Sequence, residues 1–235
     1  MRQQLQESLD ALQTQKVDIF YLHAPDKATK FEDTLLEVNK LYQEGKFVRF
    51  GLSNYSSWQV MEIYKICQEK SYVLPSVYQG RYSIMTRDVE AELFPCLRKL
   101  NIAFYAYNPL CGGFLTGKLK PESQPEGRFD SQTIQGKRYR ERYWKDNYFQ
   151  AVDWYVKACQ EHSLSPVEVA LRWVSFHSFL DVKKGDAVII GASSLAHVKQ
   201  NLEFCEKDGP LPDTLSETLE KCWHHVQPVV PRYFR

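Results

Sequence analysis

The stretch that decides the fold is Phe47-Val-Arg-Phe-Gly-Leu-Ser53-Asn54, a mainly apolar run that ends in two polar residues. An amphipathic segment of helical length precedes it at residues 31–44, and another follows at residues 58–69. A short apolar run between two such segments is typical of a strand in a parallel sheet that helices cover. We therefore predict a β/α repeat with a strand at residues 47–52.

The same order of strand and helix recurs on both sides of this stretch. Four further apolar runs predict strands at residues 17–22, 76–79, 102–107 and 187–190. Helices are predicted at residues 3–15, 31–44, 58–69, 89–100, 148–162, 166–176, 195–206 and 213–226. Residues 119–147 show no clear period, and we expect them to be irregular. Repeated β/α order favours a parallel sheet, either a barrel or an open doubly wound sheet.

Several helix ends carry recognisable capping residues. Gly45 follows the predicted helix at residues 31–44, in the usual position for a glycine after a helix C-terminus. Ser165 precedes Pro166, which predicts an N-cap followed by a proline in the first turn. Asp213 opens the last predicted helix.

The number of strands favours part of a barrel. A (β/α)8 barrel needs eight strands and roughly 250 residues, whereas this chain has 235 residues, five predicted strands and an opening helix with no strand before it. We predict an α/β fold: an incomplete (β/α)8 barrel that lacks about three N-terminal β/α units, in one partial domain over residues 1–235. Open sheet edges invite pairing, so we also expect poor solubility or a homo-oligomer.

Composition excludes some classes of partner. The formal net charge of +1 gives no reason to expect nucleic acid or an anionic membrane as a partner. A membrane span needs about 20 mostly apolar residues, and the sequence has no such run. The six cysteines form no C-x-x-C pair, which favours free thiols in a reducing compartment over a disulfide or zinc framework. We expect a cytoplasmic protein without a metal site.

Polar residues follow each predicted strand. They are His23, Ser53 with Asn54, Gln79, Asn108 after Tyr107, and Ser193 with Ser194. Each has a simpler explanation when taken alone: a structural histidine, a helix cap at Ser53-Asn54 or a turn at Asn108-Pro109. Active sites of parallel barrels lie at the carboxyl ends of the strands. We therefore expect these neutral donors and acceptors to converge on one rim, where they suit a carboxamide or a ribose.

Two segments suit an anion. Ser193 and Ser194 stand where a helix begins, and a helix N-terminus offers free N–H groups and a positive dipole end, although an ordinary capped helix explains them too. Residues 110–118 contain three glycines and end in Lys118, which permits close approach of the backbone and supplies a cation. The spacing differs from that of a P-loop.

The order of these motifs resembles the aldo-keto reductases. The motifs are Tyr21-Leu-His23-x-Pro-Asp26, Gly51-Leu-Ser-Asn54-Tyr55, Tyr78-Gln79-Gly80, Tyr105-x-Tyr-Asn-Pro-Leu110 and Gly113-x-Leu-Thr-Gly-Lys118. Arg138-Tyr-Arg-Glu-Arg-Tyr-Trp144 and Pro231-Arg-Tyr-Phe-Arg235 are similar to motifs of the aflatoxin-aldehyde reductase, or succinic semialdehyde reductase, branch. The resemblance extends over residues 2–235.

This resemblance implies NADPH-dependent reduction of an aldehyde. It implies that His23 orients the substrate carbonyl, as the one catalytic residue, and that Tyr139, Arg142 and Arg235 line the substrate pocket beside it. The implied cofactor contacts are Ser53, Asn54 and Gln79 at the carboxamide; Tyr107 under the nicotinamide; Asn108, Pro109, Leu110, Gly112, Gly113, Leu115, Gly117 and Lys118 at the pyrophosphate; Arg128; and Ser193, Ser194, His197, Gln200 and Asn201 at the adenosine end.

Two departures from the family pattern affect these expectations. The family's proton-donor tyrosine, its aspartate and its lysine would precede Met1, so we expect the chain alone not to turn over. His197 stands where many relatives have an arginine for the 2′-phosphate, which weakens the preference for NADP over NAD. Three interpretations stay open: a reductase that needs the missing strands, a non-catalytic cofactor-binding or scaffolding protein, and a fragment without independent function.

Overall fold

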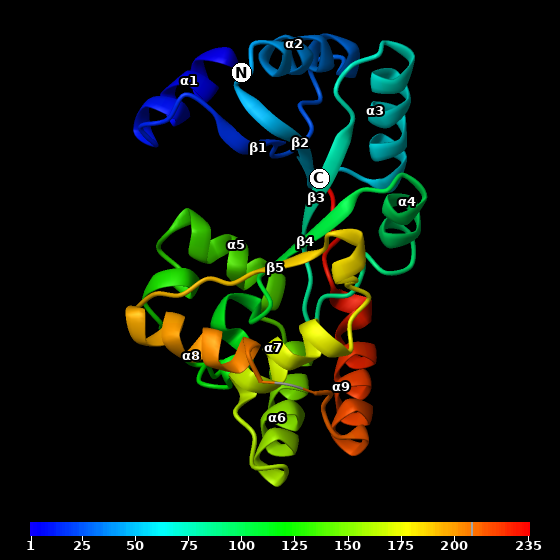
Figure 1. The fold of residues 1–235 in the computed structure, drawn as a ribbon. Coiled ribbons are helices and arrows are strands. Elements are labelled where there is room, and N and C mark those ends of the chain that lie inside the picture. The colour runs from blue at the N-terminus through cyan, green and yellow to red at the C-terminus, as the bar shows by residue number, and fades with distance from the viewer. Residues whose placement is uncertain (208) are drawn as a thin grey trace.

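A parallel sheet forms the centre of the molecule. The computed structural model describes residues 1–207 and 209–235. Five strands lie in chain order across the sheet (Figure 1), and each pairs in parallel with the next. They are β1 (Val17–Leu22), β2 (Phe47–Ser53), β3 (Pro75–Arg81), β4 (Ala103–Tyr107) and β5 (Ala187–Ile189). The carboxyl ends of all five strands therefore lie at one edge of the sheet, as the sequence predicts.

Helices follow the strands and cover the sheet. In Figure 1, α2, α3 and α4 line the outside of β1 to β4, while α5 to α9 gather beyond β4 and β5. Among these, α6 packs along α9, and α8 packs on α7. The helices of the described residues are α1 (Arg2–Ala11), α2 (Phe31–Gln43), α3 (Ser57–Glu69), α4 (Leu93–Lys99), α5 (Ile134–Tyr143), α6 (Asp146–Glu161), α7 (Pro166–Phe176), α8 (Leu195–Cys205) and α9 (Asp213–Val226).

The predicted elements are present, with three main differences. Helix α1 ends at Ala11 rather than at residue 15, because the chain turns at Gln13, which has a φ of +54°. Helix α4 begins at Leu93 rather than at residue 89, because residues 83–86 form a small bridged turn that continues into further turns. Helix α5 lies inside the stretch that we predicted to be irregular. Its Gly136 is required, because a Cβ there would overlap the backbone carbonyl of Asp130.

The helix caps agree with the sequence in part. Gly45 has a φ of +71° and follows α2, as predicted. Pro166 stands in the first turn of α7, but the predicted cap is wrong in detail, because the Ser165 side chain makes no capping hydrogen bond. Helix α3 is capped by Ser56, whose Oγ accepts from the Gln59 N–H in a capping box. Ser53 and Asn54 are thus not needed as its cap.

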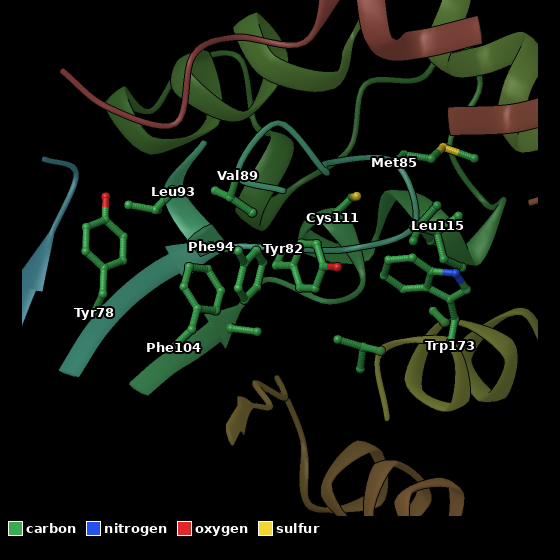
Figure 2. Close-up of a cluster of buried hydrophobic side chains, with 14 of the residues drawn as sticks. Tyr78, Tyr82, Met85, Val89, Leu93, Phe94, Phe104, Cys111, Leu115 and Trp173 are labelled. Atoms are coloured by element: carbon green, nitrogen blue, oxygen red, sulfur yellow. The ribbon is translucent and has the colours of Figure 1, made fainter. Parts of the chain in front are cut away.

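An aromatic cluster fixes β3 and β4 against the helices. Figure 2 shows Tyr82 beside Phe94, Phe104 and Trp173, each nearly or fully buried. The ring centroids of Phe94 and Phe104 lie 4.7 Å apart, and those of Tyr82 and Trp173 lie 5.6 Å apart. Truncating one such buried ring typically costs about 3–5 kcal/mol. This packing fixes the positions of β3 and β4 relative to the helices around them.

The two outer strands leave the sheet open. Among the described residues, neither β1 nor β5 pairs with a strand on its outer side. A cavity of about 1020 Å³ runs along β1 between α1 and α2, and residues such as Leu5, Leu12 and Ile19 line it, with His23 at one end. In the described residues, no helix has both the length and the apolar character that a bilayer crossing requires.

Candidate functional site

The ends of β1, β2 and β3 form the first part of the rim. Asn54 has a φ of +65°, a left-handed conformation that asparagine tolerates better than most residues. Its Nδ2 donates to the carbonyl of His23 over 2.7 Å and to Ser53 Oγ over 3.1 Å. Ser53 pairs in register with Gln79 of β3. Four predicted site residues, His23, Ser53, Asn54 and Gln79, thus lie side by side, and the His23 side chain is exposed.

Three guanidinium groups lie near enough to Tyr107, at the end of β4, for their charges to affect its phenol. Burial raises the pKa of the Tyr107 phenol, and the charges of Arg81, Arg142 and Arg235 act in the opposite direction. Arg81 is the register partner of Tyr107 across β3 and β4. The Arg235 N–H donates to the Asn54 carbonyl over 3.1 Å, which places Arg235 at the end of β2. The two arginines predicted for the substrate therefore lie at the same rim as the residues predicted for the nicotinamide.

The segment after β4 provides an accessible backbone. Asn108 has a φ of +68°, and its Nδ2 donates to the Tyr143 hydroxyl over 2.7 Å. Gly113 has a φ of +99°, and no atom lies within 4 Å of the position that a Cβ would take. Lys118 is exposed, whereas the side chains of Pro109 and Leu115 are buried and anchor the segment. The other predicted residues here, Leu110, Gly112 and Gly117, are half-buried.

Tyr139 connects this segment to the arginines. Its ring is 7% exposed and covers Gly112, where a Cβ would overlap it. The guanidinium of Arg128 lies 5.3 Å from the ring centroid and that of Arg142 lies 5.4 Å from it. Neither guanidinium makes an ion pair with a carboxylate of the described residues. Two positive charges thus converge on one buried ring, with no acidic partner in the described part of the chain.

The residues after β5 form a separate cluster. Ser194 Oγ accepts from the His197 N–H over 3.2 Å as the cap of α8, and Ser193 Oγ lies 3.1 Å from His197 Nδ1. Asn201 is buried and donates to the Gly191 carbonyl over 3.3 Å, while Gln200 is exposed. Within the described chain, no hydrogen bond joins this cluster to the rim of β1 to β4. It is connected to that rim by the pairing of Ile189 with Tyr107.

Sequence reasoning missed two residues of the site. Arg81 is 5% exposed and lies between Tyr107 and the C-terminal residues 231 and 232. An arginine two residues after Gln79 was a usable signal, because a charged side chain at a strand end in a barrel points to the rim. Tyr143, which is buried and accepts from Asn108, had no such signal, because α5 itself was not predicted.

Comparison with known proteins assigns the family. Residues 1–224 match the aldo/keto reductase family. The chain belongs to this family. It is 48% identical over 243 residues to human aflatoxin B1 aldehyde reductase member 2, and the alignment covers 100% of this chain and 67% of that protein. It is 47% identical to human aldo-keto reductase family 7 member A3, with 100% of this chain and 73% of that protein covered.

A solved structure shows the same fold. The glycerol dehydrogenase of Gluconobacter oxydans superposes with a TM-score of 0.72 at 23% identity, over 100% of this chain and 67% of that chain. The five-stranded sheet is therefore part of an aldo-keto reductase barrel, and the predicted family and fold class are confirmed. The chain spans about two thirds of the length of the relatives that it matches.

Proposed function

We propose that this chain forms the NADPH side and part of the substrate side of an aldehyde reductase. Its family and its relatives named as aldehyde reductases support the reduction of aldehydes. The observation that carries the finer proposal is the single rim, where Ser53, Asn54 and Gln79 lie beside Tyr107 and the arginines near it. The substrate class is an aldehyde that bears an acid group or a second carbonyl, of the succinic-semialdehyde or aflatoxin-dialdehyde type.

The residues present fit a dinucleotide. Amide side chains of Asn54 and Gln79 can both donate and accept, as a carboxamide requires. The open backbone at Gly113 and the exposed ammonium of Lys118 suit a pyrophosphate, and the capped start of α8 suits a further phosphate or ribose. When bound, NADPH supplies the hydride. Tyr107 offers a flat, largely buried ring on which a nicotinamide can stack.

The chain's own side chains then hold the substrate. Arginine binds carboxylates through paired, charge-assisted hydrogen bonds. Arg142 and Arg235 are close enough to Tyr107 for their charges to affect its phenol, so they can grip an acid group beside the stacked ring. His23, exposed at the end of β1, can donate to the carbonyl oxygen and hold it in place. Tyr139 keeps Arg142 in position through its ring.

Binding and turnover separate this proposal from a non-catalytic role. Purified chain is titrated with NADPH by fluorescence quenching, and NADPH oxidation is followed with 4-nitrobenzaldehyde and with succinic semialdehyde. We expect saturable binding that weakens about tenfold or more in Gln79→Ala, with Gln68→Ala on the outside of α3 as the matched control. Turnover supports a reductase that is active on its own. Binding without turnover supports either a reductase that needs the missing strands or a cofactor-binding protein. No saturable binding would contradict all of these and favour a fragment without independent function.

Three further expectations belong to the same proposal. Residues 1–235 act as a single domain. The six cysteines are free, which supports a reducing, cytoplasmic location. A second copy that covers the edge of β1 or β5 would give a homo-oligomer, which light scattering can detect.

A further inference from the structure

The C-terminal residues 231–235 lie across the rim and are held at its centre by Arg81. The Nη2 atom of Arg81 donates to the carbonyl of Pro231 over 3.1 Å and to that of Arg232 over 2.9 Å. Arg81 ends β3, while the Arg235 N–H donates to Asn54 at the end of β2. The segment therefore bridges two neighbouring strand ends, directly above residues that we assign to the cofactor.

A second anchor holds the middle of this segment. The Tyr233 hydroxyl donates to Glu92 Oε1 over 2.7 Å and accepts from the Ser57 N–H over 3.0 Å. Ser57 also bonds to Glu92, so these three residues form one small network at the start of α3. The segment is thus fixed at residues 231 and 232, at residue 233 and at residue 235, which leaves little freedom for the Arg235 backbone.

The burial of Arg81 is energetically unfavourable, because its charge is removed from water. Its side chain is almost fully buried, and its Nη1 has no hydrogen-bond partner among the described residues. The carboxylate oxygens of Asp88 are also buried, and the Arg81 charge and the backbone N–H groups of Asp88 and Tyr233 lower the pKa of Asp88 against the effect of burial. Replacing buried charges by apolar residues of similar volume is often neutral or stabilising. Stability alone therefore does not account for Arg81, whereas its two bonds to the segment do.

We propose that Arg81, with Asp88, is a positioning residue that fixes residues 231–235 as a wall of the substrate site and holds Arg235 beside Tyr107. The statement that residues 231–235 line a substrate site rests on the proposed function. Without the guanidinium, the carbonyls of Pro231 and Arg232 lose their charged donor, and Arg235 loses its fixed distance from the rim. The Asn54 side chain is held by His23 and Ser53 rather than by the segment. Among the described residues, no hydrogen bond joins residues 231–235 to Gly113 or Lys118, so we expect cofactor binding to stay.

Limited trypsin digestion tests the positioning directly. The bond between Arg232 and Tyr233 is a tryptic site, and its cleavage releases Tyr-Phe-Arg, which intact mass spectrometry detects. We expect Arg81→Met to release this peptide about tenfold faster or more, as the loss of two charge-assisted hydrogen bonds implies. The thermal midpoint should fall, because the variant leaves the buried Asp88 carboxylate without its nearby cation, so digestion is done well below that midpoint. Arg81→Lys keeps a buried donor and is expected to restore most of the protection.

A half-buried arginine with a buried carboxylate partner, at the other end of the sheet, gives the matched control. Arg98 pairs with Asp186, whose Oδ1 also accepts from the Phe104 N–H near the start of β4. Arg98→Met should lower stability and leave the release of the peptide unchanged in the folded protein. Equal release from Arg81→Met and the parent chain would overturn the inference. Equal release from Arg98→Met and Arg81→Met would also overturn it, because any loss of a buried charge would then suffice.

Ligand binding completes the test. Succinate is titrated by calorimetry into chain saturated with NADPH, as a probe for the acid group. We expect Arg81→Met to weaken succinate binding about tenfold and to change NADPH affinity less than about twofold. Equal weakening of both ligands would contradict a role for Arg81 in the substrate wall. If the parent chain binds no NADPH, the proposed function fails, and the trypsin result still decides the role of Arg81.

Discussion

Arg128 donates a hydrogen bond of 3.0 Å to the Tyr139 hydroxyl, and its guanidinium also lies over the Tyr139 ring. The same ring contacts Arg142 and covers Gly112. A residue expected at the cofactor and one expected at the substrate are therefore packed on a single aromatic side chain. Changes at this ring should affect both ligands, and the first prediction concerns the glycine beneath it.

Gly112→Ala should lower the free energy of unfolding by more than backbone strain alone would, because the added methyl group also overlaps the Tyr139 ring. Gly112 and Gly45 have the same φ of +71°, but only Gly112 faces a side chain that a Cβ would overlap. Gly45→Ala is thus a control for strain, which we expect to cost about 1 kcal/mol. We expect Gly112→Ala to lower the free energy of unfolding by about 2–3 kcal/mol and to weaken NADPH binding. Urea unfolding and fluorescence titration check both effects, and equal losses in the two variants would contradict the packing described.

Tyr143→Phe should loosen the turn after β4. The variant removes the hydroxyl that accepts from Asn108 Nδ2 and leaves a half-buried donor without this partner. Such a loss costs about 1–3 kcal/mol, and we expect weaker NADPH binding because Asn108 begins the segment assigned to the pyrophosphate. Tyr42→Phe, at a partly exposed tyrosine of α2, should leave both properties unchanged. Unaltered stability in Tyr143→Phe would show that this hydrogen bond does not fix the turn.

The strands and the rim could be predicted from the sequence because both depend on local patterns. Apolar runs such as residues 17–22 and 47–52 identify strands, and parallel order brings their ends to one edge. Helix α5 could not be predicted, since its sequence is highly charged and its position depends on the packing of its own Tyr139 against Phe129. The role of Arg81 depends on carbonyls 150 and 151 residues away, a separation that no local pattern reveals.

The stability of the chain should depend on the protonation of Asp88. Burial raises the pKa of the Asp88 carboxyl from 3.8 to about 6, with the Arg81 charge acting against it. Between these two values the folded chain holds a proton that the unfolded chain has released. This group's contribution is therefore fully present below about pH 4 and is lost as the pH rises through about 6.

Asp88→Asn gives the comparison that isolates this effect. The free energy of unfolding of Asp88→Asn minus that of the parent chain should increase by up to about 3 kcal/mol from pH 4 to pH 7, because only the parent chain is destabilised as Asp88 ionises. Urea unfolding across this range measures the difference, and the sign of the change with pH is the test. A difference that is constant over the range would mean that Asp88 does not titrate there.

His197→Arg should raise the preference for NADPH over NADH. His197 lies in the first turn of α8, where its Nδ1 is 3.1 Å from Ser193 Oγ. A guanidinium there can bind a 2′-phosphate through two hydrogen bonds, which an imidazole cannot do. We expect the ratio of the two dissociation constants to change about tenfold in favour of NADPH. Lys199→Arg, two residues further along the same helix and exposed on a different face, is the control. A ratio unchanged by His197→Arg would place the 2′-phosphate elsewhere.

Hydrogen exchange with and without NADPH tests the shared cofactor site most directly. Amide protection is measured by mass spectrometry over peptides that contain Ser53 and Asn54, Gln79, residues 107–113 and residues 193–201. Saturating NADPH should slow exchange in all four regions, while α9, which contains none of the predicted cofactor contacts, stays unchanged. Protection confined to one region, or none in the presence of saturating NADPH, would contradict a single dinucleotide site built from separate strand ends.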